Sequence, residues 1–183
     1  MDRVPVYETG GCRFDPYRVR HFSCKLHSFM IVLGIDPALI HTGWGVVKFE
    51  NNNLIYMNSG TIVVDSKLSI EKRLTTIFES VSDIIHKYKP DYLSIEETFV
   101  NSNPLTSLKL GEGRGASILA AGVNNIPVVE YSPNCIKKTI TGVGKAEKQQ
   151  VINMIKILLP NSNTKTSDEA DALAIAICHI NHL

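Results

Sequence analysis

The sequence has no apolar run that approaches the roughly 18 residues needed to span a bilayer. Its first residues include Asp2, Arg3, Pro5 and Glu8, which is not the pattern of a secretory signal peptide. Its four cysteines form no CxxC pair and have no nearby histidine at the usual spacing of zinc ligands. These absences argue against a membrane or secreted protein. We therefore expect a cytoplasmic protein with reduced thiols and no zinc.

The sequence also has little net charge, +1 at pH 7, but its charges are unevenly distributed. Residues 30–100 hold six Lys or Arg against nine Asp or Glu, a balance of −3. Residues 101–150 hold six against three, a balance of +3. The basic segment could hold a polyanion beside the acidic one, although ordinary solvated faces would give the same counts.

The composition predicts one domain preceded by a short extension. Residues 1–29 mix Pro, Gly, Arg and His without a periodic apolar pattern, so we expect a poorly ordered N-terminal extension there. Residues 30–183 contain no internal repeat or low-complexity block. With 44% apolar residues in the whole chain, this stretch is long enough to fold around one sizeable core.

Hydrophobic periodicity predicts an α/β fold. Strands are expected at 30–35, 42–49, 54–64, 91–95 and 126–130, and helices at 74–88, 105–123, 146–159 and 168–180. The first three strands follow one another with only turns between them, which indicates an antiparallel meander. The later strands alternate with helices. Together they predict a five-stranded mixed sheet that is flanked by helices on both faces.

Four carboxylates lie at the ends of apolar segments. Asp36 and Glu96 each follow a buried strand, where ligands bind in open α/β sheets. Asp168 and Asp171 are three residues apart and open the last predicted helix, after a Thr166–Glu169 capping box. Each acid also has an ordinary interpretation, as a turn residue, a surface charge or a helix cap. If the fold brings all four together, they predict a site for hard divalent cations and for phosphoryl transfer.

Several segments resemble the RuvC family of Holliday-junction resolvases, which belongs to the ribonuclease-H-like superfamily. They are Leu33-Gly34-Ile35-Asp36-Pro37, Thr42-Gly43-Trp44-Gly45-Val46, Ile95-Glu96, Leu108-Lys109-Leu110-Gly111, Gly142-Val143-Gly144, Ala146-Glu147-Lys148 and the stretch from Asp168 to Ala176. The resemblance covers about residues 30–180. Two departures are Ala38, where the family usually has Gly, and residues 1–29, which match nothing in the pattern.

The resemblance implies a ribonuclease-H-like fold and a crossover junction endodeoxyribonuclease that nicks opposed strands of a four-way junction in recombination and repair. The family's catalytic, metal-binding acids fall on Asp36, Glu96, Asp168 and Asp171. The implied cofactor is Mg²⁺, two ions per subunit, with Mn²⁺ able to substitute. The implied partners are junction DNA, a second copy of the chain, and the branch-migration proteins RuvA and RuvB.

The resemblance also implies residues that contact DNA. Its aromatic wedge falls on Phe99, and its DNA-contacting lysines on Lys137 and Lys148. Lys109 and Arg114 are further candidates for phosphate contacts, on charge alone. These residues also have ordinary interpretations. The phenylalanine could anchor a loop, and the basic residues could be solvated surface charges.

Other functions are compatible with the same acids. A ribonuclease H-like hydrolase of RNA–DNA hybrids would use identical chemistry at phosphorus. An actin-like or sugar-kinase-like ATPase also has Gly-Ile-Asp followed by Thr-Gly, but it needs a second domain for which this chain is too short. A junction-binding protein that has lost cleavage is the non-enzymatic alternative, against which the four intact acids argue.

Overall fold

The computed structural model describes residues 29–97 and 104–183, and the side chains of residues 104–107 are not described. Its elements, in chain order, are β1 (Phe29–Asp36), β2 (His41–Glu50), β3 (Asn53–Val63), α1 (Ile70–Tyr88), β4 (Tyr92–Glu96), α2 (Pro104–Val123), β5 (Val128–Tyr131), α3 (Pro133–Thr141), α4 (Lys148–Leu158) and α5 (Ser167–Ile180). Among the described helices, none is long and apolar enough to cross a membrane.

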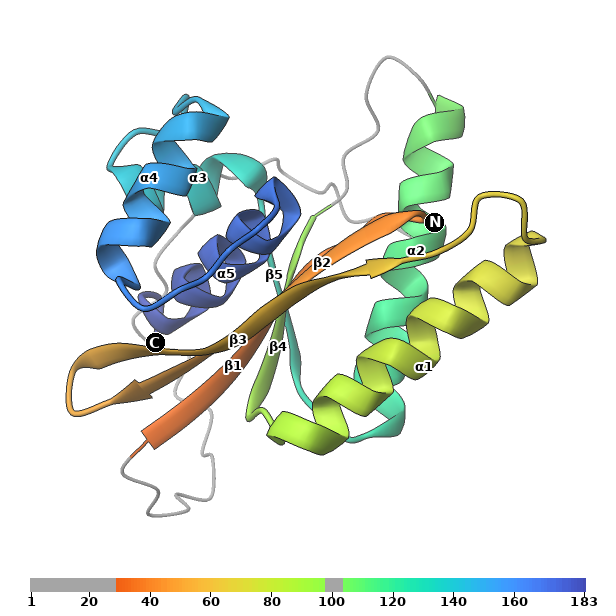
Figure 1. Ribbon diagram of the computed structural model, residues 1–183, viewed down its shortest axis with the longest axis horizontal. Helices are drawn as coiled ribbons and strands as arrows, with labels where there is room; N and C mark the ends of the chain where they lie inside the picture. The colour runs from red at the N-terminus through yellow and green to blue at the C-terminus, as the bar shows by residue number, and fades with distance from the viewer. Residues whose placement is uncertain (1–28, 98–103) are drawn as a thin grey trace, which may run out of the picture.

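The five strands form one mixed sheet in the order β3-β2-β1-β4-β5. The β1–β2 and β2–β3 pairs are antiparallel, as the predicted meander requires. The β1–β4 and β4–β5 pairs are parallel. This arrangement confirms the predicted fold class, and it makes β1 the central strand of the sheet (Figure 1).

Helices cover both faces of the sheet, so there are two hydrophobic cores (Figure 1). On one face α3, α4 and α5 pack around Val32 and Val47. On the other face α1 and α2 pack around Leu33 and Ile35. Neighbouring residues of β1 therefore enter different cores, which explains why this strand is apolar throughout rather than alternating.

The helix α3 was not predicted. It spans nine residues, which is too short for a clear helical period. Its ends nevertheless carry the usual signals: the hydroxyl of Ser132 accepts a hydrogen bond from the backbone N–H of Cys135, Pro133 occupies the first turn, and Gly142 ends the helix at φ +79°. These three signals around an otherwise unassigned segment were sufficient to locate it.

The glycines of α2 do not break that helix, which is continuous from Pro104 to Val123. Close packing accounts for the glycine at position 113, because a Cβ atom there would lie 3.0 Å from the carbonyl oxygen of Ala38. The loop that contains Ala38 is closed by Thr42, whose hydroxyl donates to the Ala38 carbonyl at 2.5 Å. The loop after Asp36 thus packs on α2 with an alanine at this position.

Candidate active site

Two of the four acids end neighbouring parallel strands. Asp36 is the last residue of β1 and Glu96 is the last residue of β4. Because these strands run in register, the two side chains leave the same edge of the sheet next to each other. They also share a face with Ser94, whose hydroxyl donates to the carbonyl of Ile175 in α5 at 3.1 Å. Both carboxylates therefore lie on the face that α5 covers.

Glycines on β1 and β2 allow α5 to lie directly on the sheet. A Cβ atom at Gly34 would lie 2.0 Å from the carbonyl oxygen of Ala172, and one at Gly43 would lie 2.2 Å from that of Asp168. Gly43 is the ladder partner of Asp36. Asp168 is thus held over the residue beside Asp36 by a contact that a larger side chain would prevent.

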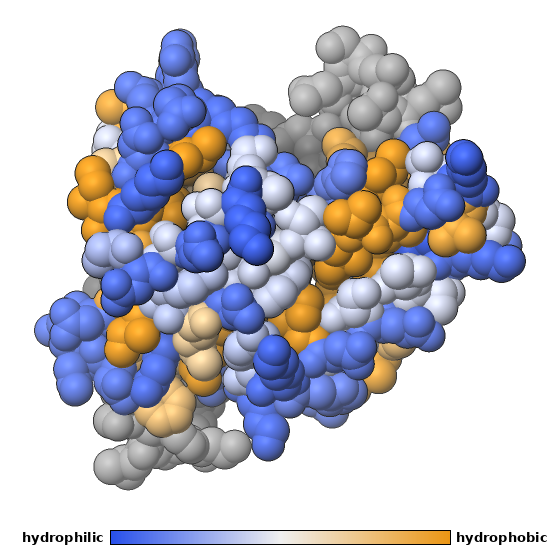
Figure 2. Space-filling model, viewed as in Figure 1, coloured by the Kyte–Doolittle hydropathy of each residue, from blue (hydrophilic) through white to orange (hydrophobic). Residues whose placement is uncertain are grey.

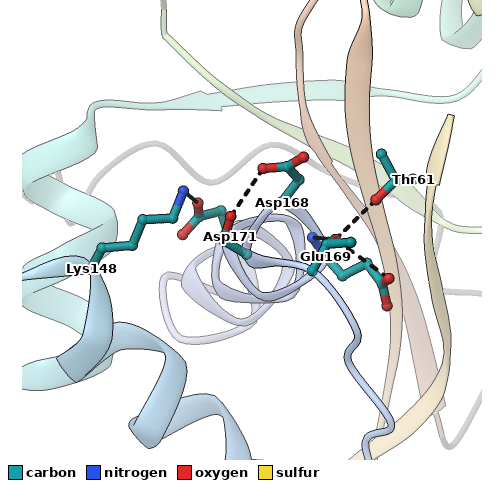
Figure 3. Close-up of polar contacts among 7 residues, drawn as sticks. Thr61, Lys148, Asp168, Glu169 and Asp171 are labelled. Carbon is teal, nitrogen blue, oxygen red and sulfur yellow. Dashed lines mark hydrogen bonds and ion pairs between the residues drawn. The ribbon is translucent and has the colours of Figure 1, made fainter. Parts of the chain in front are cut away.

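Hydrogen bonds to β3 fix the start of α5 (Figure 3). The hydroxyl of Thr166 caps the helix by accepting from the backbone N–H of Glu169 at 3.2 Å. The buried carboxylate of Glu169 accepts from the hydroxyl of Ser59 at 2.8 Å. The hydroxyls of Thr61 and Thr166 lie 2.9 Å apart. This network sets the position of the two aspartates in the first turn of α5.

A lysine from α4 reaches the acidic cluster. The Nζ of Lys148 lies 2.9 Å from Oδ2 of Asp171 (Figure 3). The side chains share a pocket of about 250 Å³ with Lys137, on α3. The full lining consists of Asp36, Glu96, Pro133, Ile136, Lys137, Lys148, Val151, Asp171, Ala174 and Ile175. Acids from the sheet and α5 therefore meet basic residues from α3 and α4 in one cavity.

Burial and neighbouring charges shift the pKa of three groups in this site. Burial, and then the charges of Glu96, Asp171 and Asp168, raise the pKa of Asp36 from 3.8 to about 7. Burial and the charge of Asp171 also raise the pKa of Glu96. Burial alone would lower the pKa of Lys148, but the hydrogen bond and charge of Asp171 raise it above its ordinary value. The cluster thus resists full ionisation.

A hard divalent cation fits this set of side chains. Four carboxylates and two lysines leave a net charge of −2 when all are ionised. Carboxylate oxygens are the ligands that Mg²⁺ and Mn²⁺ prefer. Bound cations would remove the repulsion that raises the pKa of Asp36. The four acids are therefore of the chemical type that the predicted metal site needs.

The raised pKa predicts that the cation-free protein is stabilised by replacing Asp36 with Asn, and more so at higher pH. Because the folded pKa lies above the ordinary value, the stability from this group is complete below pH 4 and is lost as the pH rises through 7. The expected gain at pH 7.5 is on the order of 4 kcal/mol, and near zero at pH 4. Denaturant unfolding in EDTA measures both, and an equal difference at the two pH values would refute the expectation.

The structure does not bring all of the candidate DNA contacts to this pocket. Lys137 and Lys148 line it. Lys109 is exposed on α2, and Arg114, also on α2, pairs with Glu130 of β5. In Figure 1, α2 covers the opposite face of the sheet from α5. Phe99 lies outside the described residues.

Sequence reasoning missed a second cluster of potential ligands. Cys135, Cys178 and His182 place one ligand atom each within 4.8 Å of one another. The signal that could have found part of it is the four-residue spacing of Cys178 and His182 at the end of α5. Cys135 belongs to α3, the helix that was not predicted, so no local pattern joined it to the pair.

Comparison with known proteins gives consistent matches. The sequence profile of a family described as "Crossover junction endodeoxyribonuclease RuvC" matches residues 32–179. A relative of that name from Brucella suis biovar 1 is 44% identical over 151 residues, which cover 82% of this chain and 87% of the relative. Another, from Rhizobium rhizogenes, is 47% identical over 148 residues, which cover 81% of this chain and 87% of the relative.

Solved structures resemble the fold as well. The RuvC of Thermus thermophilus in complex with a Holliday junction substrate superposes with a TM-score of 0.77 at 30% identity, over 82% of this chain and 93% of that one. The yeast mitochondrial Holliday junction resolvase Ydc2 has a TM-score of 0.59 at 15% identity, over 82% of this chain and 79% of its own. At 15% identity, the similarity to Ydc2 concerns the fold alone.

Proposed function

Because the chain belongs to the RuvC family of crossover junction endodeoxyribonucleases, we propose that it resolves four-way DNA junctions with the pocket described above. The observation that carries this proposal is the convergence of Asp36 and Glu96 with Asp168 and Asp171 at one end of the sheet. We expect junction resolution to take place in the cytoplasm, where reduced cysteines are stable.

The four acids would hold two divalent cations, Mg²⁺ or Mn²⁺. When bound, these ions supply the Lewis-acid chemistry of phosphodiester hydrolysis, by acidifying the attacking water and neutralising charge on the leaving oxygen. The chain itself fixes the acids: Asp36 and Glu96 through the parallel strands, and Asp168 and Asp171 through the capped start of α5.

Basic residues would position the DNA backbone. Lys137 lies on the wall of the pocket, where a phosphate that approaches the acids would meet its charge. Lys148 pairs with Asp171, so we propose that it turns to a phosphate once a cation neutralises that acid. Lys109 and Arg114 lie on α2, so they would contact DNA arms away from the pocket.

The proposed activity is tested with a labelled synthetic four-way junction and Mg²⁺, beside linear duplex DNA and an RNA–DNA hybrid. We expect symmetric paired nicks in the junction alone, and none in EDTA. Cleavage of the hybrid with the junction intact would instead identify a ribonuclease H-like hydrolase. Tight junction binding without any cleavage would identify a binding protein.

We propose that α2 is the contact between two copies of the chain, since cutting opposed strands needs two active sites. Leu108, Gly111, Gly115, Leu119 and Gly122 lie on one face of this helix. The two leucines are 65% and 59% exposed, and nothing lies within 4 Å of a Cβ atom at the three glycines. Figure 2 shows hydrophobic surface in the region that Figure 1 assigns to α1 and α2.

Leu119→Glu is therefore expected to convert a dimer into monomers at micromolar concentration, because a charge in an apolar interface is costly to desolvate. Sedimentation velocity measures the change. The matched control is Ile157→Glu, at a 69% exposed apolar position on α4, which should stay dimeric. If both variants remain dimeric, the interface lies elsewhere.

RuvA and RuvB are expected as further partners on the family resemblance alone.

Phe99 is proposed as the aromatic side chain that stacks on an unpaired base at the junction centre. It follows Glu96 by three residues in the sequence. Stacking of this kind contributes about 1–3 kcal/mol, so Phe99→Ala should slow junction cleavage by roughly 5- to 150-fold. Stabilisation of the variant by Mg²⁺ should match that of the parent. Unchanged cleavage would return Phe99 to its interpretation as a loop anchor.

A further inference from the structure

A cluster of two thiols and an imidazole lies at the far end of α5 from its two aspartates. Cys135 comes from α3, Cys178 from α5 and His182 from the turn that follows α5. The Sγ of Cys135 lies 3.7 Å from Nε2 of His182, and the Sγ of Cys178 lies 3.9 Å from its Nδ1. All three ligand atoms fall within 4.8 Å of one another. The cluster shares no residue with the acidic pocket.

We propose that Cys135, Cys178 and His182 bind one thiophilic metal ion, Zn²⁺, through two thiolate sulfurs and one imidazole nitrogen. Zinc binds sulfur at about 2.3 Å and nitrogen at about 2.0–2.1 Å in tetrahedral geometry, which sets sulfur and nitrogen about 3.6 Å apart. The Cys135–His182 distance of 3.7 Å already matches that edge. Thiolate and imidazole also select Zn²⁺ over Mg²⁺, so the two sites would take different metals.

The imidazole of His182 is held in the orientation that the site requires. Its Nδ1 lies 2.7 Å from the carbonyl oxygen of Cys178, which can only accept a hydrogen bond. Nδ1 is therefore the protonated nitrogen, and Nε2 is left with the lone pair that a metal needs. Nε2 is also the atom that lies nearest to Cys135. On the other side, the hydroxyl of Thr139 lies 3.6 Å from the Sγ of Cys178.

The fourth position of the tetrahedron would face solvent. Cys178 is fully buried and Cys135 is nearly so, but His182 is exposed. Water could therefore enter beside the imidazole and complete the coordination. Such an ion would join α3, which carries Lys137, to α5, which carries Asp171. Its role would be to hold one wall of the acidic pocket against the helix that supplies two of its acids.

The test uses the full reduced chain and titrates it with Co²⁺, which reports sulfur ligands through an intense ligand-to-metal band, and then with Zn²⁺, which displaces the Co²⁺. We expect one equivalent of Co²⁺ with thiolate absorption, displaced by one equivalent of Zn²⁺, and a higher melting temperature with Zn²⁺. Both Cys135→Ser and His182→Gln should weaken Co²⁺ binding at least tenfold, as the titration of the thiolate band measures. His182 is exposed, so the second variant should fold even if the first does not.

Two control variants separate this site from other ligands. A double variant, Cys12→Ser with Cys24→Ser, removes the other two cysteines and should keep the band. Asp171→Asn alters the acidic pocket and should keep it as well. Absence of a thiolate band in the parent, or Co²⁺ affinity equal to that of the parent in folded His182→Gln, would overturn the proposal. The readout is metal binding, so a failure of the zinc-site proposal would not affect the proposal of junction cleavage. A failure to cleave junctions would likewise not affect the zinc-site proposal.

Discussion

Asp36→Asn is expected to abolish junction cleavage while leaving junction binding within a few-fold of the parent. The substitution keeps the shape of the side chain and removes a charged oxygen at the end of the central strand, where Glu96, Asp168 and Asp171 act on it electrostatically. Loss of a charge that stabilises the transition state typically slows catalysis by about 10²- to 10³-fold, and loss of a metal ligand should lie at the upper end.

Single-turnover cleavage and a gel-shift titration in Ca²⁺ measure the two quantities. The matched control is Asp83→Asn, an acid-to-amide change at an exposed position on α1, which should alter neither. A folded Asp36→Asn variant that cleaves at the parental rate would exclude Asp36 from the active site. A large loss of binding would show that its role is not purely catalytic.

Gly34→Ala is expected to prevent stable folding. The added Cβ atom would lie 2.0 Å from the carbonyl oxygen of Ala172 and 2.7 Å from the backbone nitrogen of Ala176. These are backbone atoms in the middle of α5, so they cannot rotate away, and the helix would have to leave the sheet. Overpacking of this severity should cost about 3 kcal/mol or more, a large part of the stability of a typical domain.

Denaturant unfolding followed by circular dichroism measures that loss. The control is Gly144→Ala, in the turn before α4, where the nearest atom would lie 3.5 Å from the added Cβ atom, an ordinary van der Waals contact. Because nothing has to move there, the control should be as stable as the parent. A Gly34→Ala variant of normal stability would mean that α5 can move off the sheet at little cost.

The sequence predicted the sheet well because its strands carry strong local signals. Met30–Ile35 is a continuous apolar run, as a central strand covered on both faces requires, and β1 occupies that place. The last helix was predicted within a residue, since Thr166 caps it. Local patterns could only suggest that Asp36 converges with Asp168, because the convergence depends on contacts between segments more than 100 residues apart.

Apart from the helix α3, the features that escaped prediction are tertiary contacts. Gly34 and Gly43 in the strands let α5 approach the sheet, and this role depends on the contact between the two elements. The pair of Lys148 with Asp171 depends on how α4 packs beside α5. Cys135 approaches Cys178 only through the packing of α3, the helix that was not predicted, against α5.

The placement of α5 has a consequence for incomplete chains. Strands β1 and β4 supply two acids from the first part of the sequence, but the other two arrive only with Ser167–Ile180. That same helix covers Gly34 and fills the core on its face of the sheet. A chain that ended before residue 167, by stalled synthesis or proteolysis, would lose half of its candidate ligands together with its stable fold. Fragments that lack α5 should therefore be unable to cut DNA.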